Sequence, residues 1–369
     1  MDSPQRIVLL GATAYTGRLI AEELKEAKIE FAIAGRNNLA LLELQIELRI
    51  AARPIICDLK NDRDIENLLN QTDLLINCVG PFNLYAKPLL NKIAKKGIVY
   101  LDITGEQEIV KNSFEKLHKT ALTNQSLIVH SCSFESCLVD ILAFEKLSSQ
   151  TEYDGIYSIY SFSKSSPSPG TRFTMQLAKH FPAYQLVKGK LELCKPMAKS
   201  ISIEKENLKI ETAGFAPYPE VLFLKNRYQV KNCSSYISMA AEEIKLSLSS
   251  PIKTLDEIVK RQKKAISKGP SEEERKQQEF SILLISKTLD QKIEAFEMRG
   301  KDMYSLTAKI VLHFIKSILK NPPKSRGVRN PSEIIDGKNL LQDLQINGLI
   351  QVEKIPNINN IVEFNSAHL

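Results

Sequence analysis

A glycine turn near the amino terminus has the residue types and spacing that hold a dinucleotide. The apolar run Ile7–Leu10 leads into Gly11-Ala12-Thr13-Ala14-Tyr15-Thr16-Gly17, and helix-forming residues follow. Gly11 permits a tight turn and Gly17 lets the helix pack closely on a sheet, so backbone N–H groups at the helix start face a pyrophosphate. Ala14 replaces the middle glycine of the usual pattern. The predicted phosphate contacts are Gly11, Thr13, Ala14, Tyr15, Thr16 and Gly17.

The end of the second apolar run distinguishes between the two nicotinamide dinucleotides. It reads Ala32-Ile33-Ala34-Gly35-Arg36-Asn37-Asn38, where an NAD-specific site would place an acidic residue for the ribose 2′-hydroxyl. No carboxylate stands there. Arg36 offers a charged planar fork to a 2′-phosphate, and the amides of Asn37 and Asn38 add donors. The sequence therefore predicts NADP(H) rather than NAD(H).

The ends of the third and fourth apolar runs provide further predicted contacts with the cofactor. Asp58 closes the third run, where a carboxylate can reach the adenine amine. The fourth run ends in Asn77-Cys78-Val79-Gly80-Pro81-Phe82, and a Gly-Pro pair lets the backbone pass close to a ligand. Cys78, Gly80, Pro81 and Phe82 are therefore added to the predicted cofactor site.

Cys132 raises a different chemistry, that of a thiolate attacking an aldehyde. Such a thiolate needs a base within hydrogen-bonding reach, and His130 would share a strand face with Cys132. Two residues along a strand separate the backbones by about 6.6 Å, which is long for a direct hydrogen bond between the side chains. Packing as a small buried side chain is favoured for Cys132, and a Cys132-dependent aldehyde dehydrogenase stays open as an alternative.

Residues 6–145 provide the elements that must position these side chains. Short apolar runs there alternate with helix-forming segments. The runs are 7–10, 31–34, 54–57, 74–78, 99–103 and 127–132, and the helical segments are 16–27, 38–50, 63–69, 87–96 and 107–124. Such alternation predicts an α/β fold, a Rossmann-type doubly wound parallel sheet with helices on both faces. The carboxyl ends of its strands are the expected binding edge.

The chain after residue 150 has a different pattern. Strand-like stretches at 155–163, 185–193, 200–211 and 221–230 follow one another, and 280–286 with 293–299 reads as a hairpin. Helices are expected at 254–267, 304–319 and 331–341. We therefore expect a second α+β domain on a mixed or antiparallel sheet. The predicted division is 1–145 for the NADP(H)-binding domain, 146–324 for a substrate or lid domain, and 325–369 for a segment returning to the first domain.

Composition narrows the function classes. Fifty basic and 43 acidic residues give a formal net charge of +7, and no basic run is interleaved with aromatics, so we expect no nucleic-acid partner. The six cysteines form no C-x-x-C pair and are expected to be reduced thiols in the cytoplasm, with no metal site. We see no secretory signal at the start of the sequence and no apolar stretch of membrane-spanning length.

The expected helix at 304–319 has a basic stripe and an apolar face. The stripe consists of Lys309, His313, Lys316, Ser317 and Lys320, and the opposite face of Ile310, Val311, Phe314, Ile315 and Ile318. Peripheral contact with a membrane surface would use such a helix. A core helix or a homodimer helix with a solvated basic face is the favoured interpretation.

Several motifs together resemble the saccharopine dehydrogenase-like oxidoreductases, above all the branch with the bacterial trans-acting enoyl reductases. They are the glycine turn, Gly35-Arg36, Gly80-Pro81-Phe82 with Tyr85, Tyr100-Leu101-Asp102-Ile103-Thr104-Gly105-Glu106, His130-Ser131-Cys132-Ser133-Phe134-Glu135-Ser136, Pro169-Gly170-Thr171, Gly269-Pro270-Ser271, and Gly327-Val328 with Pro331. The resemblance covers most of the chain and adds Gly105 to the cofactor contacts. Three positions depart from the family pattern: Ser133, Glu135 and Leu138 stand for a glycine, an aspartate and a proline.

The resemblance implies an NADPH-dependent oxidoreductase that reduces an enoyl or carbonyl group of a bulky, lipid-like or polyketide-like substrate. Tyr85, Asp102, Glu106 and Ser136 are then expected around a cleft between the domains, and Tyr85 is the expected catalytic proton donor. Packing of Tyr85 against its own helix is the competing interpretation. From a different class, a non-catalytic NADP(H)-binding protein that serves as a redox-responsive or interaction module stays open.

Overall fold

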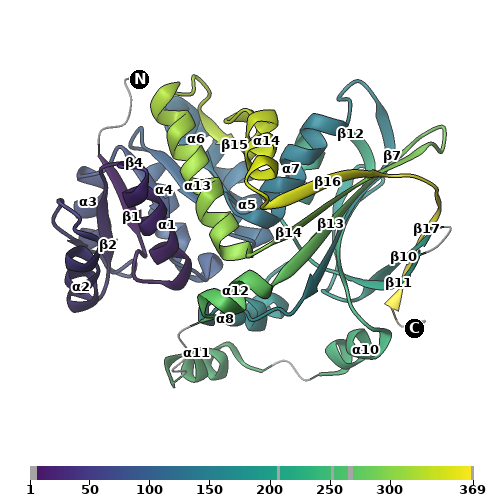
Figure 1. The fold of residues 1–369 in the computed structure, drawn as a ribbon, viewed down its shortest axis with the longest axis horizontal. Helices are drawn as coiled ribbons and strands as arrows, with labels where there is room; N and C mark the ends of the chain where they lie inside the picture. Colours follow the sequence, from purple (N-terminus) through teal and green to yellow (C-terminus); the bar gives the residue numbers. More distant parts are fainter. Residues whose placement is uncertain (1–5, 206–207, 251–252, 265–268, 367–369) are drawn as a thin grey trace. The chain divides into compact units, whose positions relative to one another are not determined.

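The protein is seen in a computed structural model, which describes residues 6–205, 208–250, 253–264 and 269–366. Its contacts divide the chain into two units (Figure 1). The N-terminal unit consists of Met1–Leu138, Ser168–Gly170 and Tyr304–Asp336. The second unit consists of Val139–Pro167, Thr171–Met303 and Gly337–Leu369. The first boundary thus lies at Leu138 rather than at 145, inside a helix that contributes to both units.

The N-terminal unit is built on a seven-stranded sheet in which every pairing is parallel. Its strands are β1 (Ile7–Leu10), β2 (Ala32–Gly35), β3 (Ile55–Ile56), β4 (Leu74–Asn77), β5 (Val99–Asp102), β6 (Leu127–Val129) and β15 (Gly327–Arg329), in the order β15-β6-β5-β4-β1-β2-β3. The order reverses between β1 and β4, which is the Rossmann arrangement. The predicted α/β fold is confirmed.

Helices alternate with these strands as the sequence predicts. They are α1 (Tyr15–Glu26), α2 (Asn38–Leu48), α3 (Asp62–Asn70), α4 (Phe82–Ile93), α5 (Gln107–Asn112), a π-helical turn (Ser113–Leu117), α6 (His118–Thr123), the first turn of α7 (Phe134–Lys146) and nearly all of α13 (Met303–Lys320). A short 3-10 helix spans Pro331–Glu333. Strands β1, β4, β5 and β6 are buried along their whole length, as expected of a parallel sheet covered on both faces.

The second unit is built on a mixed sheet. Its main strands follow the order β16-β14-β13-β7-β12-β11-β10-β17, with β8 and β9 as a side hairpin on β12. Their bounds are β7 (Glu152–Ser163), β8 (Tyr184–Val187), β9 (Lys190–Leu193), β10 (Lys199–Lys205), β11 (Leu208–Phe215), β12 (Gln229–Ser238), β13 (Glu279–Thr288), β14 (Ile293–Lys301), β16 (Ile350–Ile355) and β17 (Ile358–Asn365). Among the described strands, only the β12–β7 pairing is parallel. The predicted second α+β domain is confirmed.

The remaining helices belong to the second unit in whole or in large part. They are the rest of α7, α8 (Pro169–Leu177) with a 3-10 turn (Ala178–His180), α9 (Glu220–Arg227), α10 (Ala241–Ser249), α11 (Leu255–Lys264), α12 (Glu272–Gln277) and α14 (Gly337–Ile346).

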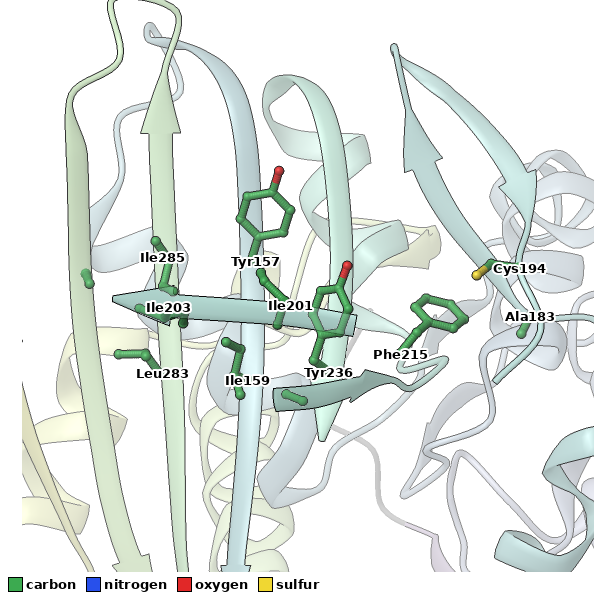
Figure 2. Packing of buried hydrophobic residues seen from close by; sticks show 12 residues of the cluster. Tyr157, Ile159, Ala183, Cys194, Ile201, Ile203, Phe215, Tyr236, Leu283 and Ile285 are labelled. Atoms are coloured by element: carbon green, nitrogen blue, oxygen red, sulfur yellow. The ribbon is translucent and has the colours of Figure 1, made fainter. Parts of the chain in front are cut away.

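One face of this sheet carries a packed apolar cluster. Figure 2 shows Tyr157 and Ile159 of β7 with Tyr236 of β12, and Ile201 and Ile203 of β10 belong to the same cluster. The two outermost strands of the sheet, β16 and β17, are consecutive in the chain and are joined by residues 356 and 357 alone. Because so short a link joins the two edges, the sheet must curl, and the cluster fills its inner face.

Two sequence-based predictions fail in this region. The stretch 221–230 was expected to be a strand, but α9 spans most of it and only the start of β12 lies there. Val221–Leu224 are all buried, and a fully buried apolar run reads the same in a helix and in a strand. The helix begins directly after Pro219, whose fixed φ suits a helix start.

The second failure concerns residues 325–369, which were expected to return to the first domain. Only their first part does, because β15 adds to β6 at the edge of the parallel sheet. Strands β16 and β17 instead pair with β14 and β10 in the second sheet. Gly337 lies against Ile141 and Glu145 on α7, where a side chain at position 337 would not fit.

Candidate dinucleotide site

The glycine turn is built as its sequence requires. Gly11 has a φ of 83°, and a Cβ atom there would lie 2.9 Å from Val79 Cγ2. A Cβ atom at Gly17 would overlap the carbonyl oxygen of Gly11. Gly11 is therefore required by its positive φ and by the close approach of the residues after β4, and Gly17 by the close packing of α1 on the turn.

The start of α1 is open to an anion. The N-cap residue, Ala14, has no side chain that can cap the helix, and the first turn contains no acidic residue. The first N–H groups of a helix lack partners within it, so they can donate to a phosphate. Arg18 is not available for this purpose, because it pairs with Glu22 at 3.0 Å and with Glu47.

Arg36 lies exposed directly after β2 and makes no ion pair or hydrogen bond with the described residues. An exposed guanidinium without a partner suits a 2′-phosphate. Asn37, the N-cap of α2, accepts a hydrogen bond from Ala40 N at 3.2 Å through Oδ1, which leaves its amide hydrogens for a ligand. The structure thus brings Arg36 and Asn37 together at the carboxyl end of β2, as predicted.

Asp58 and Tyr85 belong to the β3 side of the sheet. Asp58 Oδ1 accepts from Lys60 N at 3.0 Å, so this carboxylate also holds its own turn. Tyr85 is half-buried in the first turn of α4, and Lys60 Nζ lies 5.9 Å from the centre of its ring. No hydrogen bond joins the Tyr85 hydroxyl to the residues that the structure describes. Tyr85 therefore faces the loop after β3.

The loop after β4 is held by a carboxylate that sequence reasoning did not link to it. Glu106 accepts from Phe82 N at 2.6 Å and from Asn83 N at 2.9 Å, so it caps the amino terminus of α4. Burial raises the pKa of Glu106 to about 7, against these two hydrogen bonds, which lower it. The loop after β5 thereby fixes Phe82, one of the predicted cofactor contacts, at the start of α4 directly after Gly80 and Pro81.

Asp102 lies at the centre of a buried polar network at the ends of β5 and β6. Its Oδ2 atom accepts from the Tyr100 hydroxyl at 3.0 Å and lies 2.7 Å from His130 Nδ1. Its Oδ1 atom accepts from Thr104 N at 3.2 Å and from Ser131 N at 2.9 Å. Asp102 and His130 are both fully buried. One carboxylate thus ties together the two loops that follow neighbouring strands.

Sequence reasoning missed this network because its partners are 28 residues apart in the chain and meet only through the sheet. It had placed Asp102, Glu106 and Ser136 around a cleft with Tyr85. Asp102 and Glu106 are buried and lie with Tyr85 in the N-terminal unit, and their place around such a cleft stays a prediction. The signal that was present is the polar residue at each strand end: Asp102 is the last residue of β5, and His130 directly follows β6.

Cys132 is fully buried, and its Sγ atom donates to the Val129 carbonyl oxygen at 3.8 Å. Burial raises the pKa of the Cys132 thiol well above its ordinary value, and neighbouring Cys137 and Asp102 act in the same direction. His130 is directed to Asp102 instead. The geometry therefore favours packing for Cys132 and gives no support to a thiolate nucleophile.

Every predicted contact thus follows the carboxyl end of a strand. Across the sheet the order is Asp58 at β3, Arg36 and Asn37 at β2, Gly11 to Gly17 at β1, Cys78 to Phe82 at β4 and Gly105 at β5. A Cβ atom at Gly105 would meet no atom within 4 Å, so there is room beside this loop. A phosphate turn, an unpaired arginine and open space along one sheet edge fit an extended dinucleotide with a 2′-phosphate.

Residues 7–129 match the family model described as "Saccharopine dehydrogenase NADP binding domain". Residues 7–129, about a third of the chain, are thus similar to such a domain. The cofactor predicted from Arg36 is therefore confirmed at the level of the domain. A "Probable mitochondrial saccharopine dehydrogenase-like oxidoreductase" of Arabidopsis thaliana is 34% identical over 147 residues, 35% of this chain and 32% of the relative. A trans-acting enoyl reductase of Mycobacterium leprae is 31% identical over 144 residues, 38% of this chain and 34% of the relative.

These alignments cover about a third of the length of the curated relatives. The likeness in fold extends further. The apo saccharopine dehydrogenase (L-Glu forming) of Saccharomyces cerevisiae matches with a TM-score of 0.60 at 11% identity, over 95% of this chain and 99% of that one. The NADP-binding domain and the second mixed-sheet unit therefore follow the architecture of that enzyme.

The amphipathic helix α13 is a core helix. Ile310, Val311, Phe314 and Ile315 are fully buried, and Lys309 pairs with Glu23 of α1 at 2.9 Å. Its apolar face is therefore not available to a membrane surface, which corrects the alternative drawn from its sequence. Among the described residues, the structure has no helix with the length and apolarity needed to cross a bilayer.

Proposed function

We propose that the protein is an NADPH-dependent oxidoreductase that reduces an enoyl or carbonyl group of a small molecule. The observation that carries the proposal is Arg36, exposed and unpaired at the end of β2, in a domain that matches an NADP-binding family. Relatives of this domain include proteins named saccharopine dehydrogenase-like oxidoreductases and trans-acting enoyl reductases. When bound, NADPH supplies a hydride.

The chain's own residues would bind and orient the cofactor. Arg36 and Asn37 would hold the 2′-phosphate, and the first N–H groups of α1 would receive the pyrophosphate. Asp58 would receive the adenine amine. The carboxyl-end loops of β4 and β5, with Gly80 and Gly105, would leave room for the flat ring. These roles place the adenosine half on the β2–β3 side and the reacting half on the β4–β6 side.

The substrate is proposed to be bulky and lipid-like or polyketide-like, in line with the enoyl reductases among the relatives. We further infer a homodimer and a cytoplasmic site of action. All six cysteines are buried free thiols, which a reducing compartment preserves. One matched relative carries the word mitochondrial in its name, so fractionation of the native host, with NADPH-oxidising activity as the marker, is the direct check.

Tyr85 is the proposed proton donor. Its hydroxyl makes no hydrogen bond with the described residues, and Lys60 Nζ lies 5.9 Å from the centre of its ring. Tyr85→Phe should then lower kcat about 100-fold while leaving NADPH affinity unchanged, because only proton donation is lost. Lys87→Ala, on the same helix and exposed, serves as the control. Unchanged turnover in Tyr85→Phe would assign Tyr85 to packing.

The decisive experiment follows NADPH absorbance at 340 nm with catalytic amounts of protein. The substrates are trans-2-enoyl thioesters from four to sixteen carbons and medium-chain aldehydes and ketones. Oxidation of many equivalents of NADPH per protein, with the reduced product identified by mass spectrometry, is the expected result. NADPH binding without turnover on any of these compounds would support the non-catalytic alternative instead.

A further inference from the structure

The imidazole of His130 has one nitrogen committed and one without a partner. A carboxylate oxygen 2.7 Å from Nδ1 requires the proton on Nδ1, which donates to Asp102. In the neutral ring Nε2 then carries a lone pair and acts only as an acceptor. This atom is buried and has no hydrogen-bond partner among the described residues. A buried polar atom in this state lacks a hydrogen bond that a ligand can supply.

Ser131, the next residue, shows the same feature as His130. Its Oγ atom is also buried and without a partner in the described part of the chain. Its φ of 60° lies in the left-handed region, which a serine adopts at a cost of about 1 kcal/mol or more. The hydrogen bond from Ser131 N to Asp102 holds the backbone in this conformation. Such strain concentrates at ligand-binding positions.

The other buried polar side chains of these loops are already satisfied. Asp102 accepts four hydrogen bonds. Asn77 accepts from Val79 N and donates to the Tyr100 hydroxyl. Glu106 caps α4. In the described loops that directly follow β4, β5 and β6, the buried polar side-chain atoms left for a ligand are therefore His130 Nε2, an acceptor, and Ser131 Oγ, which can donate.

The order of the strands indicates which half of a dinucleotide would lie near His130 and Ser131. Arg36 and Asp58 follow β2 and β3, on one side of the glycine turn at β1. The adenosine half is proposed to bind on that side. His130 follows β6, three strands away from β1 on the opposite side, which is about 14 Å at the usual strand spacing. In this fold the nicotinamide half extends over that side.

We propose that His130 and Ser131 form the subsite for the nicotinamide carboxamide. The carboxamide NH₂ would donate to His130 Nε2, and the Ser131 hydroxyl would donate to the carboxamide oxygen. Asp102 is a positioning residue, because it fixes the imidazole tautomer and the Ser131 backbone without touching the ligand. The subsite rests on the proposed NADP(H) site and specifies its reacting end.

The affinities of three ligands distinguish the contribution of the subsite from that of the rest of the site. They are NADP⁺, its nicotinic acid analogue, which has a carboxylate in place of the carboxamide, and 2′,5′-ADP, which lacks the nicotinamide half. The variant is His130→Asn, whose side-chain amide can keep the bond to Asp102 while Nε2 is removed. By calorimetric titration it should bind NADP⁺ about three- to tenfold more weakly and 2′,5′-ADP as the unchanged protein does. Preference for NADP⁺ over the carboxylate analogue should shrink by the same factor.

Arg36→Ala is the matched control, because it should weaken all three ligands together. Ser131→Ala removes a hydroxyl that has no partner, so it provides the same comparison if His130→Asn does not fold. Equal losses for NADP⁺ and 2′,5′-ADP, or no loss for either, would overturn the subsite while leaving the proposed function intact. Failure of the unchanged protein to bind NADP⁺ would overturn the proposed function and the subsite together.

Discussion

Arg36 is the residue proposed to select the cofactor by charge, because it offers a guanidinium where an NAD-specific domain offers a carboxylate. A charge-assisted hydrogen bond of this kind contributes about 1.5–3 kcal/mol, so NADPH should bind at least about tenfold more tightly than NADH. Arg36→Ala should remove most of this preference. Fluorescence titration with both cofactors measures it.

The control for this prediction is Arg53→Ala. Arg53 is also exposed but precedes β3, so it lies at the opposite edge of the sheet from Arg36. It should leave the cofactor preference unchanged. Equal affinities of the unchanged protein for NADPH and NADH would contradict the assignment of Arg36.

At the scale of single residues, Glu106 makes a pH-dependent contribution to the free energy of unfolding. Burial raises its pKa from an ordinary 4.5 to about 7, so the folded state holds the proton more tightly than the unfolded state. The resulting stabilisation is fully present below pH 4.5 and is lost as the pH rises through 7, a change of about 3 kcal/mol. Urea unfolding from pH 4.5 to pH 8 should show this fall in the unfolding free energy relative to Glu106→Gln, which cannot ionise.

Glu108→Gln, two residues later in the same loop and helix, is the comparison for other titrating groups. Because it keeps Glu106, its unfolding free energy should still fall between pH 4.5 and pH 8 relative to Glu106→Gln. Parallel curves for the unchanged protein and Glu106→Gln would show that Glu106 titrates alike in the folded and unfolded states.

At the scale of elements, the contact between β1 and α1 depends on Gly17. A methyl group there would overlap the Gly11 carbonyl oxygen, so Gly17→Ala must push the helix from the turn. We expect a loss of about 1–3 kcal/mol in unfolding free energy and NADPH binding weakened about tenfold or more. Gly35→Ala is the control for stability, since its methyl group would meet Leu41 at 3.8 Å, an ordinary contact. Chemical denaturation with NADPH titration measures both, and equal stability of the two variants would contradict the packing argument.

The elements differ in how far their sequences determine them. Alternation of apolar runs and helices was enough for the N-terminal unit, because parallel strands buried on both faces are apolar along their length. It failed at α9, where four buried apolar residues carry no period. It also could not assign β16 and β17, whose partners β14 and β10 are distant in the chain.

The residues of the candidate site also differ in how far the sequence could predict them. Gly11, Gly17 and Arg36 could be predicted because each lies close to the end of its own strand, where the local sequence determines the geometry. The contacts of Asp102 with His130, and of Glu106 with Phe82, join loops of different strands. Only the strand order reveals such pairs, so a single sequence marks their members as polar residues at strand ends and no more.

At the scale of the whole molecule, the two units have separate buried polar centres. Every residue proposed for NADPH lies in the N-terminal unit. In the second unit, Glu220 is fully buried at the start of α9. Its Oε1 atom accepts from the hydroxyls of Ser158 at 2.6 Å, Tyr160 at 2.8 Å and Ser235 at 2.8 Å. These residues belong to β7 and β12, so one carboxylate ties the helix to the only parallel pair of the mixed sheet.

Glu220→Ala should therefore separate stability from cofactor binding. The substitution leaves three buried hydroxyls without their acceptor, so we expect the unfolding free energy to fall by about 3 kcal/mol. NADPH affinity, measured where the variant is still folded, should stay unchanged, because no proposed cofactor contact involves the second unit. Glu242→Ala, an exposed glutamate of the same unit, should change stability by less than about 0.5 kcal/mol. A folded Glu220→Ala protein with weakened NADPH binding would contradict this separation, because it would make the mixed sheet a part of the cofactor site.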